Sequence, residues 1–94
     1  MTGYRIDTEL AEFGQHIHGW RMVLGVTAEQ VSERAGISRD TLRKIENGNA
    51  TVSARAVAQV LRALGILDVL VQAADPLNSD VGKLRAPRLG RSRA

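Results

Sequence analysis

The stretch TAEQVSERAGISRDTLRKIENG, residues 27–48, decides the fold of this chain. Two short helical patterns meet at Gly36, where the chain has to turn sharply and where glycine adopts a positive φ at little steric cost. Thr27 with Gln30 three residues later is typical of a capping box that starts a helix. Ser38 can start the next helix by accepting a hydrogen bond from a backbone N–H. The stretch therefore predicts two consecutive helices that are joined by a tight turn.

Apolar side chains at helical spacing extend this pattern on both sides. A first helix, capped by Asp7 or Thr8, is expected to run to about Leu24, and a fourth, capped by Ser53, to end before Gly65. The side chains expected on the inner faces of the four helices are Leu10, Phe13, Ile17, Trp20 and Leu24, then Ala28, Val31, Ser32 and Ala35, then Leu42 and Ile45, and finally Ala54, Val57, Ala58, Leu61 and Leu64. These stripes predict one small helical core.

Residues 66–74 suit a fifth helix, and apolar side chains lie on nearly all of its sides. One small core cannot cover so much apolar surface, which indicates a homodimer interface at Leu67, Leu70 and Val71. We expect residues 1–75 to form a single domain that ends with this helix.

The last part of the chain, residues 76–94, differs in composition from the rest. Its net charge is +4, against −1 for residues 1–75, so the high pI of about 10.2 comes from this segment. We expect it to be a basic, flexible tail. It suits either a nonspecific DNA arm or a segment that becomes ordered on a protein partner, and its isolated apolar side chains favour the partner. These candidate partner-binding residues are Leu77, Val81, Leu84 and Leu89.

The composition argues against several classes of protein. The 94 residues can bury only one modest core, and the apolar residues, 44 % of the chain, fall into helical periods instead of one run that would span a bilayer. We expect no membrane segment and, with neither a secretory leader nor cysteine, a cytoplasmic protein. His16 and His18 do not make a metal-binding set, and no nucleophile stands with a base. We therefore expect no cofactor, no metal and no enzymatic activity.

From Phe13 to about Leu64 the chain resembles the phage-repressor-like, or Xre-type, helix-turn-helix family. The matching stretches are Phe13-Gly14, Ile17, Trp20-Arg21, residues 25–27, residues 35–38, Thr41-Leu42, residues 45–48 and residues 61–65. The resemblance implies an all-α, four- to five-helix, lambda-repressor-like DNA-binding domain whose helix-turn-helix lies between Thr27 and Asn47. The second helix of such a motif enters the major groove of DNA. Ala28 is a departure, because the family often has a phosphate-binding Gln there.

The resemblance implies that the outward side chains at the start of the third helix contact bases, and here these are Arg39, Asp40 and Lys44. Arg39 and Lys44 can donate to guanine, while Asp40 can accept from a cytosine amino group or hold Arg39 in place. The candidate phosphate contacts are Gln30, Ser32, Ser38, Thr41, Arg43, Asn47, Thr51 and Arg55. By the same resemblance, Arg21 and Glu46 form a structural ion pair.

A second, looser resemblance concerns residues 67–82 and the basic end, which are similar to short Xre-type antitoxins encoded beside HipA-like kinase toxins. It implies an antitoxin that represses its own operon and holds the kinase toxin. Such a protein would bind double-stranded DNA with an inverted repeat as a homodimer. Two alternatives remain open: a stand-alone phage or plasmid repressor, and an adaptor that uses a helix-turn-helix fold to bind protein only.

Overall fold

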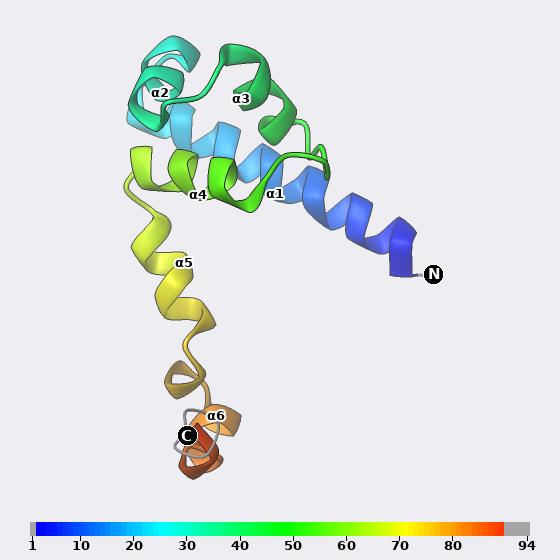
Figure 1. Cartoon of the computed structure of the whole chain (residues 1–94), viewed down its shortest axis with the longest axis vertical. Helices are drawn as coiled ribbons and strands as arrows, with labels where there is room; N and C mark the ends of the chain where they lie inside the picture. The colour runs from blue at the N-terminus through cyan, green and yellow to red at the C-terminus, as the bar shows by residue number, and fades with distance from the viewer. Residues whose placement is uncertain (1, 90–94) are drawn as a thin grey trace.

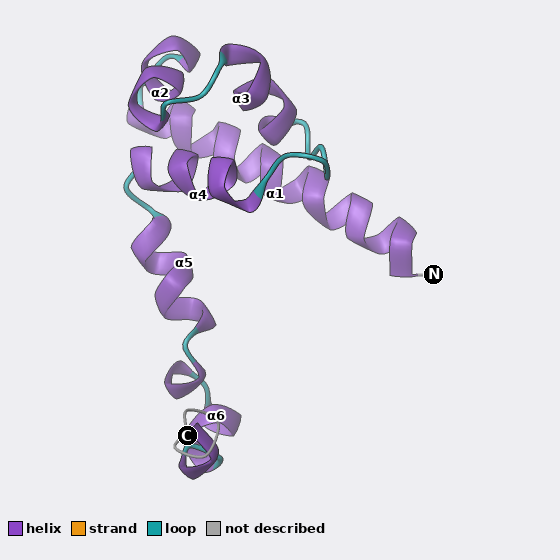
Figure 2. Cartoon of the chain, viewed as in Figure 1, coloured by secondary structure: helices purple, strands orange, loops and turns teal. Residues whose placement is uncertain are grey.

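The structure is a computed structural model that describes residues 2–89. Within that range every regular element is a helix, as Figure 2 shows, and the predicted all-α fold is confirmed. The helices are α1 (Thr2–Leu24), α2 (Ala28–Ala35), α3 (Arg39–Glu46), α4 (Ala54–Ala63), α5 (Leu67–Ala74), the 3-10 helix η1 (Pro76–Asn78) and α6 (Asp80–Leu84). Helices α1 to α4 pack together as a four-helix bundle, and α5, η1 and α6 extend away from it (Figure 1).

The turn between α2 and α3 is fixed by the local bonds that the sequence predicts. Thr27 Oγ1 accepts from the backbone N–H of Gln30 at 3.0 Å, and Gln30 Oε1 accepts from the N–H of Thr27 at 2.9 Å. Gly36 ends α2 with a φ of 70°. Ser38 Oγ then accepts from the N–H of Thr41 at 3.0 Å and starts α3. The capping box, the left-handed glycine and the serine cap are all confirmed.

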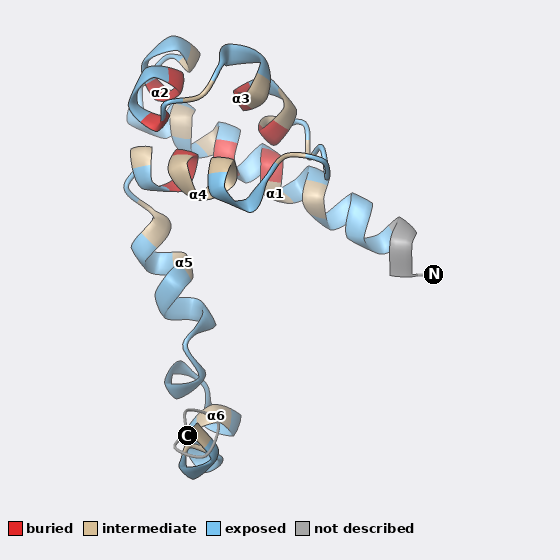
Figure 3. Ribbon diagram, in the orientation of Figure 1, coloured by how far each residue is buried: buried red, intermediate tan, exposed pale blue. Residues whose placement is uncertain are grey.

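The core lies between the four helices of the bundle (Figure 3). Its buried apolar residues are Ile17, Val31, Ala35, Leu42, Ile45, Val60, Leu61 and Leu64. Val60 is fully buried, although the sequence analysis did not place it on the inner face of its helix. Ala54, which was placed there, is exposed because it lies in the first turn of α4, beyond the edge of the core.

Helix α1 differs from its prediction at both ends. It begins at Thr2 instead of at a cap on Asp7 or Thr8, and its first turns project past the bundle (Figure 1). Near its other end, Trp20 and Leu24 were expected in the core but are 44 % and 47 % exposed. The apolar stripe of α1 is longer than the core that the other three helices provide, so its last members face α5 instead.

Two glycines allow α1 to cross directly against the end of α3. A Cβ atom added to Gly14 would lie 2.5 Å from the carbonyl oxygen of Glu46, and one added to Gly48 would lie 2.5 Å from the Cα of Ala11. Gly48 also has a φ of 77°, which side chains disfavour. The backbone of α3 is therefore held against α1 at a separation that no larger residue permits.

We call residues 67–84, which comprise α5, η1 and α6, the arm. Leu67 and Leu70 are half-buried because they pack against the core of the bundle. On the other sides of α5, Val69 and Val71 are 67 % and 59 % exposed. The bundle thus covers one side of α5 and leaves apolar side chains on the others.

The far end of the arm is folded by local bonds. Asp75 Oδ1 accepts from the N–H of Leu77, and Ser79 Oγ accepts from the N–H of Gly82, each at 2.9 Å. A Cβ atom on Gly82 would overlap the carbonyl group of Pro76, so α6 folds back closely on η1. Part of the segment that was expected to be a tail is therefore helical, and residues 90–94 lie outside the described residues.

No helix within residues 2–89 combines the length and the apolar character that are needed to cross a membrane.

Candidate nucleic-acid interface

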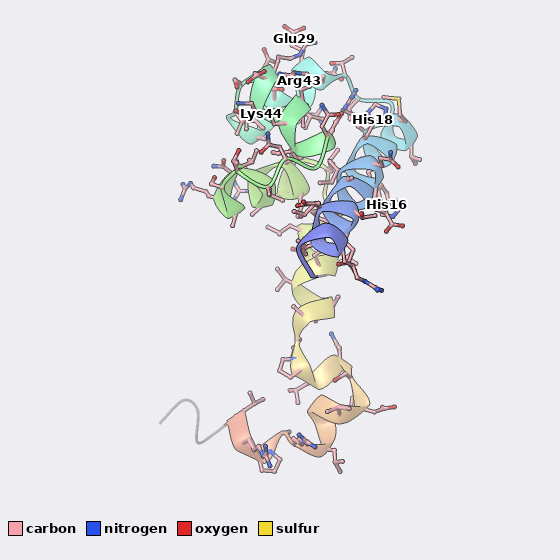
Figure 4. All side chains as sticks on the ribbon, turned by 90° about the vertical axis from the view of Figure 1, so that its right-hand side faces the viewer. His16, His18, Glu29, Arg43 and Lys44 are labelled. Carbon is pink, nitrogen blue, oxygen red and sulfur yellow. The ribbon has the colours of Figure 1, made fainter. Side chains whose placement is uncertain are left out.

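The outer face of α3 carries a cluster of charged side chains, and the core holds the inner face in place. Leu42 and Ile45 anchor the helix with exposed fractions of 1 % and 4 %. Arg39, Asp40 and Arg43 are exposed on the opposite side. Figure 4 shows Arg43 and Lys44 on this helix, at the end of the molecule opposite the arm. A rigid backbone therefore presents these cations to one side of the bundle.

A hollow of about 390 Å³ lies beside this charged face. The ends of α1 and α3 and the start of α2 meet there. Its lining residues are Arg21, Ala28, Arg39, Asp40, Leu42, Arg43 and Glu46. Three of these residues are arginines and two are acidic, so the lining carries a small net positive charge, to which a phosphate-bearing ligand is attracted.

Asp40 organises the charges of α3. Its carboxylate accepts from Arg43 and lies 3.3 Å from the Nζ atom of Lys44. The hydrogen bond from Arg43, followed by the one from Lys44, lowers the pKa of Asp40. The expectation that Asp40 holds Arg39 is wrong, because residues three and four positions along a helix are its neighbours and the next residue is not. Arg39 has no hydrogen-bond or ion-pair partner among residues 2–89, so its donors face solvent.

Arg21 and Glu46 connect α1 to the end of α3. Arg21 Nε and Nη2 donate to the two carboxylate oxygens of Glu46 at 2.9 and 3.1 Å, and both side chains are 12 % exposed. Burial alone would raise the pKa of Glu46, but the hydrogen bonds from Arg21 and His18 outweigh it and lower the pKa. The hydrogen bond to Glu46 in turn raises the pKa of Arg21. The pair stays ionised at neutral pH and fixes the angle of α3 on α1.

His18 completes this cluster, a role that the sequence analysis did not predict. Its Nδ1 atom lies 2.9 Å from Glu46 Oε1 and 3.1 Å from Arg21 Nη2. Depending on the tautomer, the ring donates to the carboxylate or accepts from the guanidinium. The spacing of three residues between His18 and Arg21 was the available signal, because it places both side chains on one face of α1.

The candidate phosphate contacts differ in how exposed they are and in the hydrogen bonds that they make. Ser32 is wrong as a contact, because it is 4 % exposed and its hydroxyl donates to the carbonyl oxygen of Ala28 at 2.7 Å. Gln30 and Ser38 both act in helix caps, and Ser38 also donates to Thr41 Oγ1 at 2.9 Å. The exposed residues of this group are Gln30, Ser38, Arg43, Asn47, Thr51 and Arg55.

The structure brings some of these residues together beside the start of α4. Thr41, Lys44 and Thr51 line a hollow of about 370 Å³, and the backbone at the start of α4 is close by. Thr51 is oriented by a hydrogen bond from its backbone N–H to Asn49 Oδ1 at 2.8 Å. Hydroxyl groups, a cation and the end of a helix form a surface that suits a phosphate group.

Within residues 2–89, no three His, Asp or Glu side chains gather closely enough to hold a metal ion.

A family model described as a helix-turn-helix domain matches residues 12–74, which is about two thirds of the chain and includes α2 and α3 with their flanking helices. The comparisons with curated proteins and with solved structures found no match.

Proposed function

The chain belongs to the helix-turn-helix domain family, whose members are typically DNA-binding regulators, and we propose that it is a sequence-specific transcriptional repressor. The observation that carries this proposal is the outer face of α3. Arg39, Arg43 and Lys44 project from a helix whose other side is fixed by Leu42 and Ile45. A short, rigid, cationic helix at the edge of a bundle has the shape and the charge to enter the major groove.

Within this proposal, Arg39 reads bases. Its guanidinium has no competing partner among residues 2–89, so all of its donors are available for the O6 and N7 atoms of a guanine. Lys44 is a second base contact, and Asp40 accepts from a cytosine amino group or orients Lys44 toward its base.

Arg43 belongs to the phosphate contacts, together with side chains around the ends of α2, α3 and the start of α4. The others that remain in the proposal are Gln30, Ser38, Thr41, Asn47, Thr51 and Arg55. Contacts of this kind set the register of the protein on DNA and carry no sequence preference of their own.

We further propose that the protein acts as a homodimer on an inverted repeat. Two-fold symmetric operators are read by two recognition helices whose half-sites lie about 34 Å apart. The apolar side chains that the bundle leaves exposed on α5 support such a dimer. Val71 is one of them, whereas Leu67 and Leu70 are half-buried because they also pack against the core.

A more specific proposal is that this repressor is the antitoxin and autorepressor of a HipA-like kinase toxin. Its support is the looser sequence resemblance together with the far end of the arm. Leu77, Val81 and Leu84 are 45 %, 65 % and 80 % exposed, and Leu89 is half-buried. Burying such side chains against a partner would contribute about 1.5 to 3 kcal/mol each, before the cost of ordering the segment.

The proposed function is tested by selecting the preferred duplex from a random DNA library and titrating it at several salt concentrations. Binding that neutralises several phosphates falls steeply with salt, with a slope of about −0.9 for each phosphate. An adaptor that binds protein only would have no duplex affinity and would contradict the proposal.

The antitoxin proposal needs a second comparison, in which the chain is truncated after Asp75. The truncated protein is expected to keep the preferred duplex, because α3 is intact, and to lose capture of the purified kinase. Unchanged capture of the kinase would contradict the proposed role of the arm. If the full chain did not capture the kinase either, the stand-alone repressor would be the remaining alternative.

A further inference from the structure

The chain exposes more surface than a compact monomer of its mass. Its accessible surface is 7033 Å² for 10.2 kDa, whereas a folded monomer of that mass is expected to expose about 5300 Å². Its radius of gyration is 15.9 Å, against an expected value of about 12 Å. The surplus of about 1700 Å² is larger than the roughly 800 Å² that one partner of a stable complex buries. The projecting arm accounts for this shape (Figure 1).

An apolar groove of about 650 Å³ lies where the arm leaves the bundle. The second half of α1 forms one wall and α5 forms the other. The large apolar side chains that line it include Phe13, Trp20 and Leu24 on α1 and Ile66, Val69 and Leu70 on the other side. His16 is the single titratable side chain of the lining, and its Nε2 atom lies 4.0 Å from Glu12 Oε2.

Large apolar side chains in this groove remain open to solvent. Trp20 and Leu24 on α1 are 44 % and 47 % exposed, and Val69 on α5 is 67 % exposed. Side chains scattered singly would be ordinary for a monomer, but a continuous apolar groove with an exposed tryptophan marks a contact surface. Tryptophan is also among the residues that contribute most to protein interfaces.

We propose that this groove binds α5 of a second copy of the chain, so that the dimer interface combines α1 with α5. The inference rests on the proposed homodimer and extends it from α5 alone to a surface built by two helices. Trp20 and Leu24 of one copy cover the exposed Val69 of the other, and the reverse contact is identical by symmetry.

A second copy fits the groove better than any other occupant. A two-fold interface requires a ridge and its matching groove on the same patch of the molecule. Helix α5 supplies both, since it is a wall of the groove and carries Val69 and Val71 on its open sides. DNA does not suit an apolar groove, and residues 83–94 are too basic to fill it.

Such a dimer also leaves the DNA-binding face available. No residue of α2 or α3 lines the groove, whose described walls come from α1, α5 and the turn after α4. Two copies joined here therefore keep both α3 helices exposed, as an inverted repeat requires.

The test uses Trp20, the single tryptophan of the chain, as the probe. Fluorescence of the full-length protein is recorded from nanomolar to high micromolar concentration, alongside sedimentation equilibrium. We expect the emission to shift to shorter wavelength as the dimer forms, because the indole becomes buried. Val69→Lys is expected to raise the dimer dissociation constant by about 30-fold or more, since two valines lose their cover in each dimer.

Val23→Lys is the matched control, because Val23 is 79 % exposed on α1 and does not line the groove. It is expected to dimerise like the original chain, and circular dichroism should show both variants folded. A chain that is monomeric at all concentrations overturns the proposal. So does a Val69→Lys variant that dimerises normally, or a short emission wavelength that does not depend on concentration, which would indicate another occupant.

Duplex titration of the same two variants separates this inference from the proposed function. Val69→Lys is expected to bind a single half-site as well as the original chain does. If no variant binds any duplex while the dimer forms as described, the DNA-binding function fails and the groove assignment stands.

Discussion

The four-helix bundle and the arm are built from similar helices but are stabilised in different ways. Every helix of the bundle contributes residues to the core, whose exposed fractions range from 0 % to 6 %. No residue of α5, η1 or α6 is buried, and these elements depend on local caps such as Asp75 and Ser79. Helices this short are marginal without tertiary packing. The bundle therefore holds its own shape, whereas the arm has apolar surface left for a partner.

The largest difference between the two regions is expected when one leucine is truncated in each. Leu42→Ala removes a side chain that is 1 % exposed and should lower the free energy of unfolding by about 3 to 5 kcal/mol. Leu84 is 80 % exposed, so Leu84→Ala should change it by less than about 0.5 kcal/mol. Urea denaturation of the two variants gives both values. Equal losses would show that the arm is part of the same cooperative unit.

Features that depend on neighbouring residues could be predicted from the sequence, whereas features that depend on how distant segments pack could not. The turn at Gly36 and the caps at Thr27 and Ser38 depend on residues within four positions of each other, and they were predicted correctly. The exposure of Trp20 depends on how the arm leaves the bundle after Gly65, which no local pattern encodes.

The candidate site divides in the same way. The charged residues on the outer face of α3 and the pairing of Asp40 with Arg43 follow from helical spacing. The place of His18 beside Glu46 does not, because the two residues are 28 positions apart and meet only when α3 packs against α1.

The second prediction concerns charge inside the bundle. Glu46→Ala leaves Arg21 without its carboxylate at a site that is 12 % exposed, and should cost about 3 kcal/mol of unfolding free energy. Asp80→Ala removes an exposed carboxylate from the arm and should leave that free energy unchanged. A small effect of Glu46→Ala in the same denaturation experiment would show that the pair does not fix α3.

Glu46 also gives a pH dependence with a defined sign. Its pKa is lower in the folded chain than the ordinary value of 4.5, so its contribution to stability is present above pH 4.5 and is lost as the pH falls through the folded-state pKa. Glu46→Gln should remove this part of the acid sensitivity while leaving that of the exposed carboxylates. Urea midpoints measured from pH 7 down to pH 3 test it, and parallel curves for the two proteins would contradict it.

The fourth prediction concerns whether DNA recognition depends on the bundle alone. Arg39→Ala should cost about 1 to 3 kcal/mol on the preferred duplex and relax the base preference, because a base contact is lost. Arg43→Ala should weaken all duplexes alike, and Lys83→Ala in the arm should leave the base preference unchanged. Competition titrations with preferred and random duplexes measure these differences. If Arg39→Ala weakened both duplexes by one factor, Arg39 would be a phosphate contact.

The smallest expected effect compares two serine caps of the same geometry. Ser38 Oγ accepts from the N–H of Thr41 at 3.0 Å in the bundle, and Ser79 Oγ accepts from the N–H of Gly82 at 2.9 Å in the arm. Ser38→Ala should lower the free energy of global unfolding by about 1 kcal/mol, because α3 cannot fray without exposing the core. Ser53→Ala, at the cap of α4, should behave in the same way.

Ser79→Ala should leave global unfolding unchanged and act only on the arm. The N–H of Gly82 loses its acceptor, so its hydrogen exchange should become faster while the amides of α3 and α4 keep their protection. Circular dichroism at a fixed denaturant concentration and residue-resolved exchange measure the two effects separately. If Ser79→Ala instead lowered the global free energy as much as Ser38→Ala does, α6 would unfold together with the bundle. The arm would then owe its conformation to the bundle and not to its own local bonds.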